Sequence, residues 1–383
     1  MFKKLVLHVG CEKTATTAMQ KALAGSRAKL KKNGFLYPRS LGHQNHTRLV
    51  AAVQDDGVLD NIRAHILAKE AISTAGLRRK LAHEFKSEVL AAKKCHTLIV
   101  SSELIHSRVH TDSEIDRLLA FFAPYVETIE VVLYLRPQVE LAISRFSSLL
   151  RSGYSEFDKI FEPKEEIHYK KWPKNRQVDA HEQFYDFQAL IKRFERRVPR
   201  EQIKLVLYPD LSAVDHALRR FSELAGFDVS LLTVPKEPLN PAMSAHAQFV
   251  IAEVNKRVRR VYSSGLRRDD VKDLYDCIES AMPGELRMVS RLQAETFMQS
   301  FEASNQWVCD HYFPSRETLF DMDYTRHPET VDYSHLLSVL AAPLKGVLGR
   351  ARRLRGSESA TSRGKRMVQK VRRVFQYVGI AKS

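Results

Sequence analysis

A short apolar segment that runs through a glycine into a turn rich in threonine constrains this chain more than any other feature. Residues 5–9 are apolar except for His8, and Gly10 follows them directly. The turn reads Lys-Thr-Ala-Thr-Thr over residues 13–17 and continues into a helical pattern of apolar residues. This order of residues predicts a buried strand, a sharp loop and a helix.

The loop between this strand and helix has the composition of an anion-binding site. Gly10 permits a sharp turn, so that the N–H groups of the loop and of the helix N-terminus point at one spot, where the helix dipole favours negative charge. Lys13 adds a mobile cation, and Thr14, Thr16 and Thr17 add hydroxyl donors. The segment therefore predicts a ligand with phosphate or sulfate. The alternative is an ordinary strand, turn and helix with a solvated lysine.

The spacing of the loop differs from the usual nucleotide-binding pattern G-x-x-x-x-G-K-[ST]. Only two residues separate Gly10 from Lys13, and no second glycine precedes the lysine. A small-molecule kinase that uses ATP and Mg²⁺ is an alternative reading. It would require a G-K-[ST] loop end and an acidic metal ligand after a neighbouring strand, where this chain has Ser-Ser-Glu at residues 101–103.

A second segment predicts another anion site. Residues 129–135 form an apolar run that ends in Arg136-Pro137, and an amphipathic pattern follows. Pro137 suits the first turn of a helix, and Arg136 stands at the carboxyl end of the predicted strand, where open α/β sheets bind ligands. Ser144 lies eight residues after Arg136, about two helical turns on. A guanidinium and a hydroxyl can hold a second phosphate; a capping arginine and a surface serine are the alternative.

Strand and helix patterns alternate along most of the chain. Apolar strand patterns occupy residues 5–9, 97–101, 129–135 and 203–207, and a helical pattern follows each of them. Such alternation predicts an α/β fold, a parallel sheet flanked by helices on both faces. Mostly helical patterns after residue 240 predict a helical C-terminal part. We expect one domain over residues 1–330 and a separate basic tail over residues 341–383.

The two anion motifs together resemble the sulfotransferases that use PAPS (3′-phosphoadenosine 5′-phosphosulfate), in particular their bacterial branch. Lys13, Thr14, Thr16 and Thr17 match the family's loop for the 5′-phosphosulfate, and Arg136 and Ser144 match its 3′-phosphate site with the same spacing. Weaker likenesses follow in chain order, in the sequences NGFLYP at residues 33–38, SSE at 101–103, LVLYPDL at 205–211 and SNQW at 304–307. The resemblance covers roughly residues 1–325. It implies a P-loop-like core, PAPS as donor and PAP, the 3′,5′-bisphosphate, as product.

The resemblance has implications for the loop and one departure within it. It implies that Gly10 and residues 13–17 hold the 5′-phosphosulfate without a metal ion. Ala15 stands where the family most often has glycine. Since an L-residue is disfavoured at positive φ, we expect the loop to avoid positive φ at Ala15.

Transfer of a sulfuryl group to a hydroxyl requires a general base beside the fixed positive charge of Lys13. Glu103 is the first candidate, because it follows the second predicted strand and the family places a histidine or glutamate near this point. His46, with His43 nearby, is the second candidate, and His106 is another. The alternatives are a structural ion pair of Glu103 and polar loop histidines.

Residues 153–178 predict the class of acceptor. They combine tyrosines and a tryptophan with many lysines, a composition that suits a sugar or an anionic glycan. The preferred acceptor is therefore the hydroxyl of a carbohydrate or glycolipid, with another small alcohol or an amine as the alternative. An ordinary exposed loop is the plainer reading.

The positive charge of the chain is concentrated at its C-terminal end. The formal net charge of the 383 residues is +16, and twelve Lys/Arg against one Glu after residue 340 place +11 of it in the tail. Apolar residues recur at helical spacing in this tail, which predicts contact with an anionic membrane surface. Nucleic-acid binding is not indicated, because no reading motif accompanies the charge. A non-enzymatic protein that binds polyanions through the tail is an alternative to the enzyme.

The remaining composition is that of an enzyme in a reducing compartment. No stretch reaches the ~20 apolar residues of a membrane helix. The four cysteines are scattered and have no metal-binding spacing. We expect a cytoplasmic protein, with the tail on the inner face of the membrane as a further possibility.

Overall fold

The computed structural model describes the chain as two compact units. The described residues are 1–156, 184–208, 213–233, 243–258 and, apart from 277, 281 and 283, 275–331. The first unit comprises Met1–Gln138, the described residues of Pro163–Asn240, and Phe301–Asp321. The described residues of Val139–Glu162, Pro241–Ser300 and Met322–Ser383 form the second. Most of the predicted acceptor segment, from residue 157 on, and the whole basic tail lie outside the described residues.

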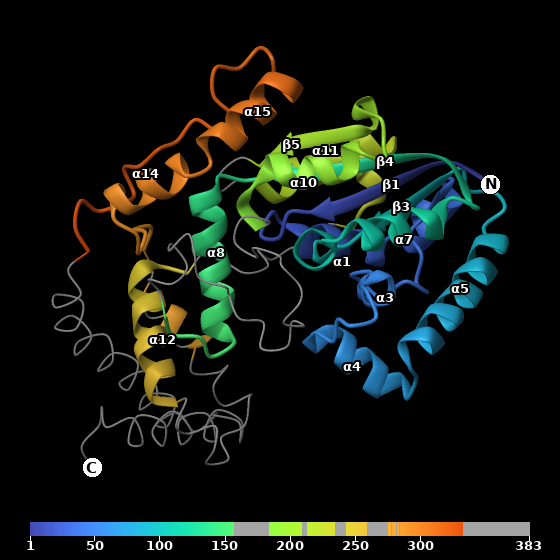
Figure 1. Cartoon of the computed structure of the whole chain (residues 1–383), viewed down its shortest axis with the longest axis horizontal. Helices are drawn as coiled ribbons and strands as arrows, with labels where there is room; N and C mark the ends of the chain where they lie inside the picture. Colours follow the sequence, from blue (N-terminus) through green and yellow to red (C-terminus); the bar gives the residue numbers. More distant parts are fainter. Residues whose placement is uncertain are drawn as a thin grey trace, which may run out of the picture. The chain divides into compact units, whose positions relative to one another are not determined.

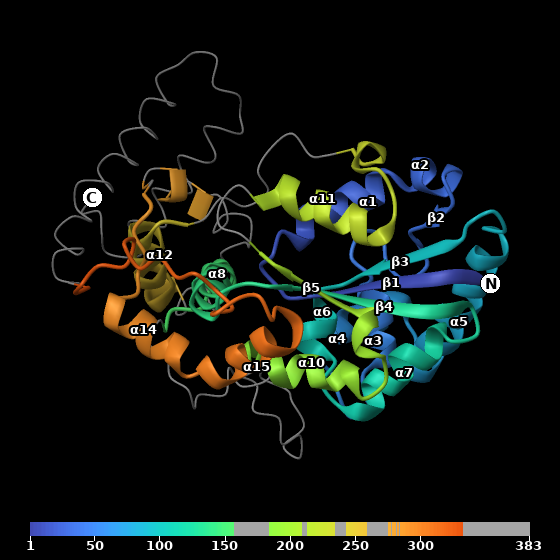
Figure 2. The ribbon, with the colours of Figure 1, turned by 90° about the horizontal axis from the view of Figure 1, so that it is seen from above.

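A five-stranded sheet forms the centre of the first unit. Its strands are β1 (Phe2–Gly10), β2 (Phe35–Leu36), β3 (Thr97–Ser101), β4 (Val126–Leu135) and β5 (Ile203–Leu207). They are all parallel, in the order β2-β3-β1-β4-β5. The predicted α/β class is confirmed. Because β1 lies between β3 and β4, the residues that follow these three strands meet at one edge of the sheet (Figure 2).

The strands are apolar on both faces, as expected for a parallel sheet that helices cover on each side. The last six residues of β1 and the last five of β4 are buried without interruption. One face packs against α1 (Thr16–Gly25), α2 (Arg27–Lys32) and α11 (Ala213–Ala225) (Figure 2). Val6, Ile99 and Val132 contribute to this apolar cluster from the sheet, and Met19 and Phe221 contribute from the helices.

The other face of the sheet carries six helices in the described part of the first unit (Figures 1 and 2). They are α3 (Thr47–Val53), α4 (Asn61–Glu70), α5 (Thr74–Leu90), α6 (Leu104–Arg108), α7 (Asp112–Phe122) and α10 (Phe187–Glu195). Helix α7 begins with a capping box in which Thr111 and Glu114 satisfy each other's backbone N–H groups. Short 3₁₀ turns at Arg200–Gln202 and Val229–Leu231 complete the unit together with α15.

Helix α15 (Glu302–Tyr312) packs against α10 although more than a hundred residues separate them in the chain. The Ser304 hydroxyl donates to Asp186, the residue that caps α10, over 2.7 Å. Tyr312 donates its hydroxyl to Glu195 over 2.9 Å at the other end of α10. The SNQW sequence therefore contributes to the packing of α15 in this structure.

Some elements differ from their sequence patterns. β2 is only two residues long, too short to show a periodicity. The segment over residues 61–90 forms two helices, because Ala71 ends α4 with a left-handed backbone at φ 51°. Ser26 similarly separates α1 from α2.

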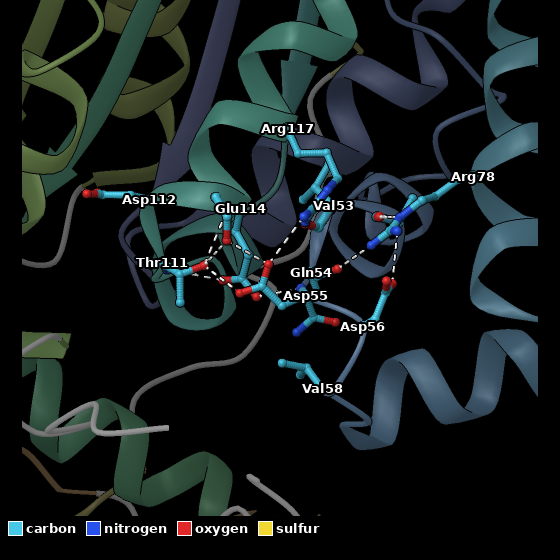
Figure 3. A network of polar contacts seen from close by, with 12 residues as sticks. Val53, Gln54, Asp55, Asp56, Val58, Arg78, Thr111, Asp112, Glu114 and Arg117 are labelled. Carbon is cyan, nitrogen blue, oxygen red and sulfur yellow. Dashed lines mark hydrogen bonds and ion pairs between the residues drawn. The ribbon is translucent and has the colours of Figure 1, made fainter. Parts of the chain in front are cut away.

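Three arginines satisfy carbonyl groups at the C-terminal end of α3, and Figure 3 shows Arg78 and Arg117 among them. Arg78 donates to the carbonyls of Ala52 and Gln54, each over 2.8 Å. Arg117 donates to the carbonyl of Val53, and the buried Arg63 donates to the two carbonyls that follow in the turn, those of Asp55 and Val58. These side chains from α4, α5 and α7 replace the helical partners that the end of a helix lacks.

The second unit contains α8 (Gln138–Arg151) from Val139 on, α12 (Ala245–Val258) and α14 (Arg291–Gln299). A buried pair between Arg287 and Glu140 crosses this unit, with the nearest N and O atoms 2.8 Å apart. Asn255 of α12 donates to the carbonyl of Leu150 over 2.8 Å. The helical C-terminal part expected from the sequence is present.

Among the described residues, no helix combines the length and apolar character needed to cross a membrane.

Candidate functional site

The loop after β1 adopts an alternating backbone conformation. Lys13 and Ala15 have left-handed backbones with φ of 66° and 59°, and Thr14 between them does not. The expectation that Ala15 avoids positive φ is therefore wrong. Successive N–H groups in such an alternation converge on a concave surface of the kind that binds anions, and Ala15 adopts the conformation despite the steric cost of its Cβ.

Hydrogen bonds to neighbouring segments hold the loop in place. The N–H of Cys11 donates to the carbonyl of Tyr134 in β4 over 2.9 Å. The Thr14 hydroxyl donates to the carbonyl of Cys11 over 2.7 Å. Gly10 is needed for close approach, since a Cβ there would lie 3.1 Å from the Cβ of His106. The buried Thr14 hydroxyl thus stabilises the loop, which differs from the ligand contact that its sequence position indicated.

Backbone donors remain at the start of α1. The N–H groups of Thr14, Ala15, Thr16 and Thr17 donate to no other group among the described residues, and no side chain caps the helix. Thr17 is exposed, whereas Thr16 is buried. The helix dipole adds partial positive charge at the same place. The loop therefore presents several unsatisfied donors, which is the requirement for an anion site.

Arg136 lies directly against this loop. Its Nη1 donates to the carbonyl of Lys13 over 3.0 Å, and its guanidinium lies 5.7 Å from the centre of the Tyr208 ring. The structure thus brings the Arg136 side chain to the backbone of Lys13, although the two residues lie 123 positions apart in the sequence. Positive charge from two adjacent strands is concentrated at one edge of the sheet.

Ser144 lies on α8 in the second unit and is partly buried. Arg136 belongs to the first unit. Their joint site for a 3′-phosphate therefore stays a prediction from the sequence.

Glu103 follows β3 and is held by two amide groups. Its Oε2 accepts a hydrogen bond from Gln20 over 2.6 Å and another from Asn45 over 2.9 Å. Burial raises the pKa of the Glu103 carboxyl, and the hydrogen bond from Gln20 partly opposes this shift. The charges of Glu12 and Lys13 also act on Glu103, which places it near the loop after β1. A carboxyl whose pKa is raised by burial is a stronger base once ionised, which suits proton transfer.

His46 has a different environment from the one expected of a base. Its Nε2 donates to the carbonyl of Pro38 over 3.0 Å, and its Nδ1 accepts the N–H of Ser101 over 3.1 Å. The ring is fully buried, and burial lowers its pKa to about 3. Because both nitrogens serve the backbone and the ring is hard to protonate, this conformation gives His46 a role in fixing the loop before α3.

The structure also shows the surroundings of His106 and His43. The buried His106 ring accepts the N–H of Glu12 at Nδ1 over 3.4 Å and contacts the carbonyl of Phe184 through Nε2 at 3.0 Å. His43 is exposed, and its carbonyl accepts a hydrogen bond from Arg27. Among the four candidates, Glu103 is the titratable group on which the charge of Lys13 is seen to act.

Sequence reasoning missed Gln20 and Asn45. Gln20 interrupts the apolar face of α1 between Met19 and Ala22, and a buried amide there is a signal that could have been noticed. Asn45 stands in a polar loop, where nothing in the local pattern distinguishes it. Its role depends on the distant Glu103, which only the folded chain brings near.

Comparison of this chain with protein-family models, with curated proteins and with solved structures gives no match.

Proposed function

We propose that this protein is a sulfotransferase that moves the sulfuryl group of PAPS to a hydroxyl or amine of an acceptor. The observation that carries the proposal is the loop after β1. Two left-handed residues and four unsatisfied N–H groups lie there beside Lys13 and Arg136. The resemblance of residues 13–17, Arg136 and Ser144 to the PAPS-dependent family specifies the anion.

The residues divide into three roles under this proposal. The N–H groups of residues 14–17 and the cation of Lys13 bind the 5′-phosphosulfate and stabilise the charge that develops on the phosphate side during transfer. Arg136 and Ser144 bind the 3′-phosphate. Bound PAPS supplies the activated sulfuryl group, and PAP is the product.

Glu103 accepts the proton of the attacking group. Its position after β3 and its burial support this role, since a raised pKa makes a carboxylate a better base. The fixed donors of the loop contribute more to catalysis than the base does, because in-line transfer depends mainly on positioning and electrostatic stabilisation. No metal ion is part of the proposal.

The acceptor class and the location rest on the sequence. Residues 153–178 favour a carbohydrate or glycolipid, and the basic tail after residue 340 favours contact with an anionic membrane surface on the cytoplasmic side.

Replacement of Lys13 by alanine tests the catalytic assignment. We expect Lys13→Ala to lower the rate of sulfuryl transfer by a factor of about 100 or more, because one fixed charge in the transition state is lost. Lys21→Ala, which removes an exposed lysine of the helix that follows the loop, is the matched control and should leave the rate unchanged. Transfer would be followed by PAP formation and acceptor labelling. Turnover retained in Lys13→Ala would refute the assignment.

Calorimetric binding of PAP and of ATP–Mg²⁺ tests the donor. The full chain should bind PAP more tightly than ATP–Mg²⁺, and a chain that ends at residue 340 should retain this preference. Arg136→Ala should weaken PAP binding more than binding of a 5′-monophosphate. A preference for ATP–Mg²⁺ would indicate a kinase or hydrolase, and loss of PAP binding with the tail would indicate a polyanion-binding segment.

A further inference from the structure

The two side-chain hydrogen bonds that the described residues make to the Glu103 carboxyl end on one oxygen. The backbone of Glu103 itself also acts on this carboxyl and lowers its pKa. Gln20 and Asn45 approach from two different segments, and both donate to Oε2. A carboxylate accepts hydrogen bonds at both oxygens, so this asymmetry leaves Oε1 with a different environment from Oε2.

Gln20 is held by a second hydrogen bond from the same amide nitrogen that donates to Glu103. The residue is buried on α1, and its Nε2 also donates to the Ser101 hydroxyl over 3.3 Å. The same hydroxyl oxygen lies 2.8 Å from Nδ1 of His8 in β1. Since a carboxylate only accepts, the nitrogen of the Gln20 amide must face Glu103. The position of this donor is therefore set by packing inside the sheet.

Asn45 is oriented by a second hydroxyl. Its Oδ1 accepts a hydrogen bond from Ser102 over 2.6 Å, while its Nδ2 donates to Glu103. Ser102 directly precedes Glu103 in the chain. The Asn45 amide satisfies both partners only in this orientation, with its oxygen toward Ser102 and its nitrogen toward Glu103.

The loop that carries Asn45 is fastened on both sides of this residue. On one side, the Tyr37 hydroxyl donates to the carbonyl of Gln44 over 2.7 Å. On the other, the ring and backbone of His46 bond to Ser101 at the end of β3. Arg27 donates to the carbonyls of Tyr37 and His43. Asn45 is therefore held by the same strand that presents Glu103.

We propose, on the basis of the proposed function, that Gln20 and Asn45 are positioning residues that hold Oε2 of Glu103 and direct Oε1 to the proton of the acceptor. Neither residue touches the reacting atoms in this assignment. Each acts by fixing the orientation of the carboxylate and by stabilising its charged form.

This arrangement predicts how the carboxyl of Glu103 responds to the loss of a donor. The charged and titratable groups around it are Glu12 and Lys13 on the loop after β1 and Tyr37 after β2. A hydrogen bond to the charged form lowers a carboxyl pKa, so its removal raises the pKa, here by about one unit. A residue that only filled space would leave the titration of Glu103 unchanged.

The experiment measures the Glu103 titration by ¹³C NMR of the full chain labelled at glutamate side-chain carboxyls, with E103Q used for assignment. The test variants are Gln20→Leu and Asn45→Leu. Gln44→Leu is the matched control, because its amide lies in the same loop and bonds to the carbonyl of Thr17 at 3.5 Å. We expect the pKa of Glu103 to rise by about one unit in both test variants and to stay constant in the control.

Asn45→Asp adds an isosteric variant that does not depend on whether the buried Gln20→Leu folds. It replaces the donor by an acceptor of the same shape and sets a like charge against Oε2, so the pKa of Glu103 should rise further than in Asn45→Leu. An unchanged titration in Asn45→Leu and Asn45→Asp, or an equal shift in Gln44→Leu, would overturn the proposal.

The pH dependence of sulfuryl transfer separates this inference from the proposed function. The acid limb of the rate profile should move to higher pH together with the NMR titration in each test variant. The titration could shift as expected in a parent protein that neither binds PAP nor transfers sulfuryl groups. That result would refute the proposed function, but it would still show that Gln20 and Asn45 position the Glu103 carboxyl.

Discussion

At the scale of single residues, the loop after β1 depends on backbone conformations that side chains normally oppose. Lys13 and Ala15 both have positive φ, a conformation that disfavours L-residues by about 1 kcal/mol or more. Ala15 is also partly buried against the apolar cluster under α1. The anchoring of the loop by Cys11 and Thr14 offsets this unfavourable conformation.

Substitution of two alanines by glycine tests this view of the loop. Ala15→Gly should leave the free energy of unfolding equal to that of the parent or slightly higher, because glycine relieves the left-handed conformation. Ala24→Gly is the matched control, since Ala24 packs against the same cluster but has a helical backbone. It should lower the free energy of unfolding by about 1 kcal/mol. Urea unfolding measures both, and an equal loss in both variants would contradict the left-handed assignment.

At the scale of elements, the C-terminal end of α3 shows how arginines terminate a short helix (Figure 3). Its carbonyls have no helical partners, and guanidinium groups from neighbouring helices replace them. The following residue pair, Asp55 and Asp56, brings opposite charge to the same place, and Asp56 lies 2.9 Å from Arg78. Helix α3 is therefore held by its neighbours as much as by its own sequence.

Two consecutive arginines on α5 provide a test of this arrangement. Arg78→Met should lower the free energy of unfolding by about 1–3 kcal/mol, because two carbonyls lose a charged donor. Arg79→Met removes an exposed neighbour that has no hydrogen bond or ion pair among the described residues, and its effect should stay within about 0.5 kcal/mol. Denaturant unfolding compares the two. Similar effects would mean that Arg78 does not cap α3.

At the scale of the whole molecule, two fully buried histidines connect folding to pH. Burial lowers the pKa of His8 and of His46 to about 3 each, from 6.5 in an unfolded chain. Between these pH values the unfolded chain binds more protons than the folded one, so the free energy of unfolding falls as the pH falls. This contribution to stability is fully present above about pH 6.5.

The pH dependence of unfolding provides a measurement for the whole chain. Between about pH 6.5 and pH 3, each buried histidine should contribute a slope of up to about 1.4 kcal/mol per pH unit. His8→Leu should reduce the slope of the parent by about this amount between pH 6 and pH 5. His83→Gln, which changes an exposed histidine on α5, should leave the slope unchanged. A His8→Leu slope equal to that of the parent would show that His8 does not resist protonation.

The organisation into two units also belongs to this scale. No change in composition before residue 340 marks a boundary, and the second unit is assembled from three separate parts of the chain. The sequence predicts one domain over residues 1–330. The division of the chain into two compact units is a further feature that sequence patterns do not reveal.

The sequence by itself determined the α/β class, four of the five strands and the cationic loop after the first of them. The short-range periodicity of apolar residues predicts buried strands and amphipathic helices, and a glycine and a lysine identify the loop from the local sequence. It also singled out Glu103, because a polar residue after a buried strand faces the carboxyl edge of a parallel sheet.

Only the tertiary structure decided the conformation of Ala15 and the roles of Gln20, Asn45 and His46. Ala15 is left-handed in a loop that is anchored to β4, a strand more than a hundred residues away. The two amides and the histidine act through partners that are 55 to 83 residues distant in the chain. Local patterns carry no information about such partners, since a hydrogen bond between distant segments exists only once packing has brought them together.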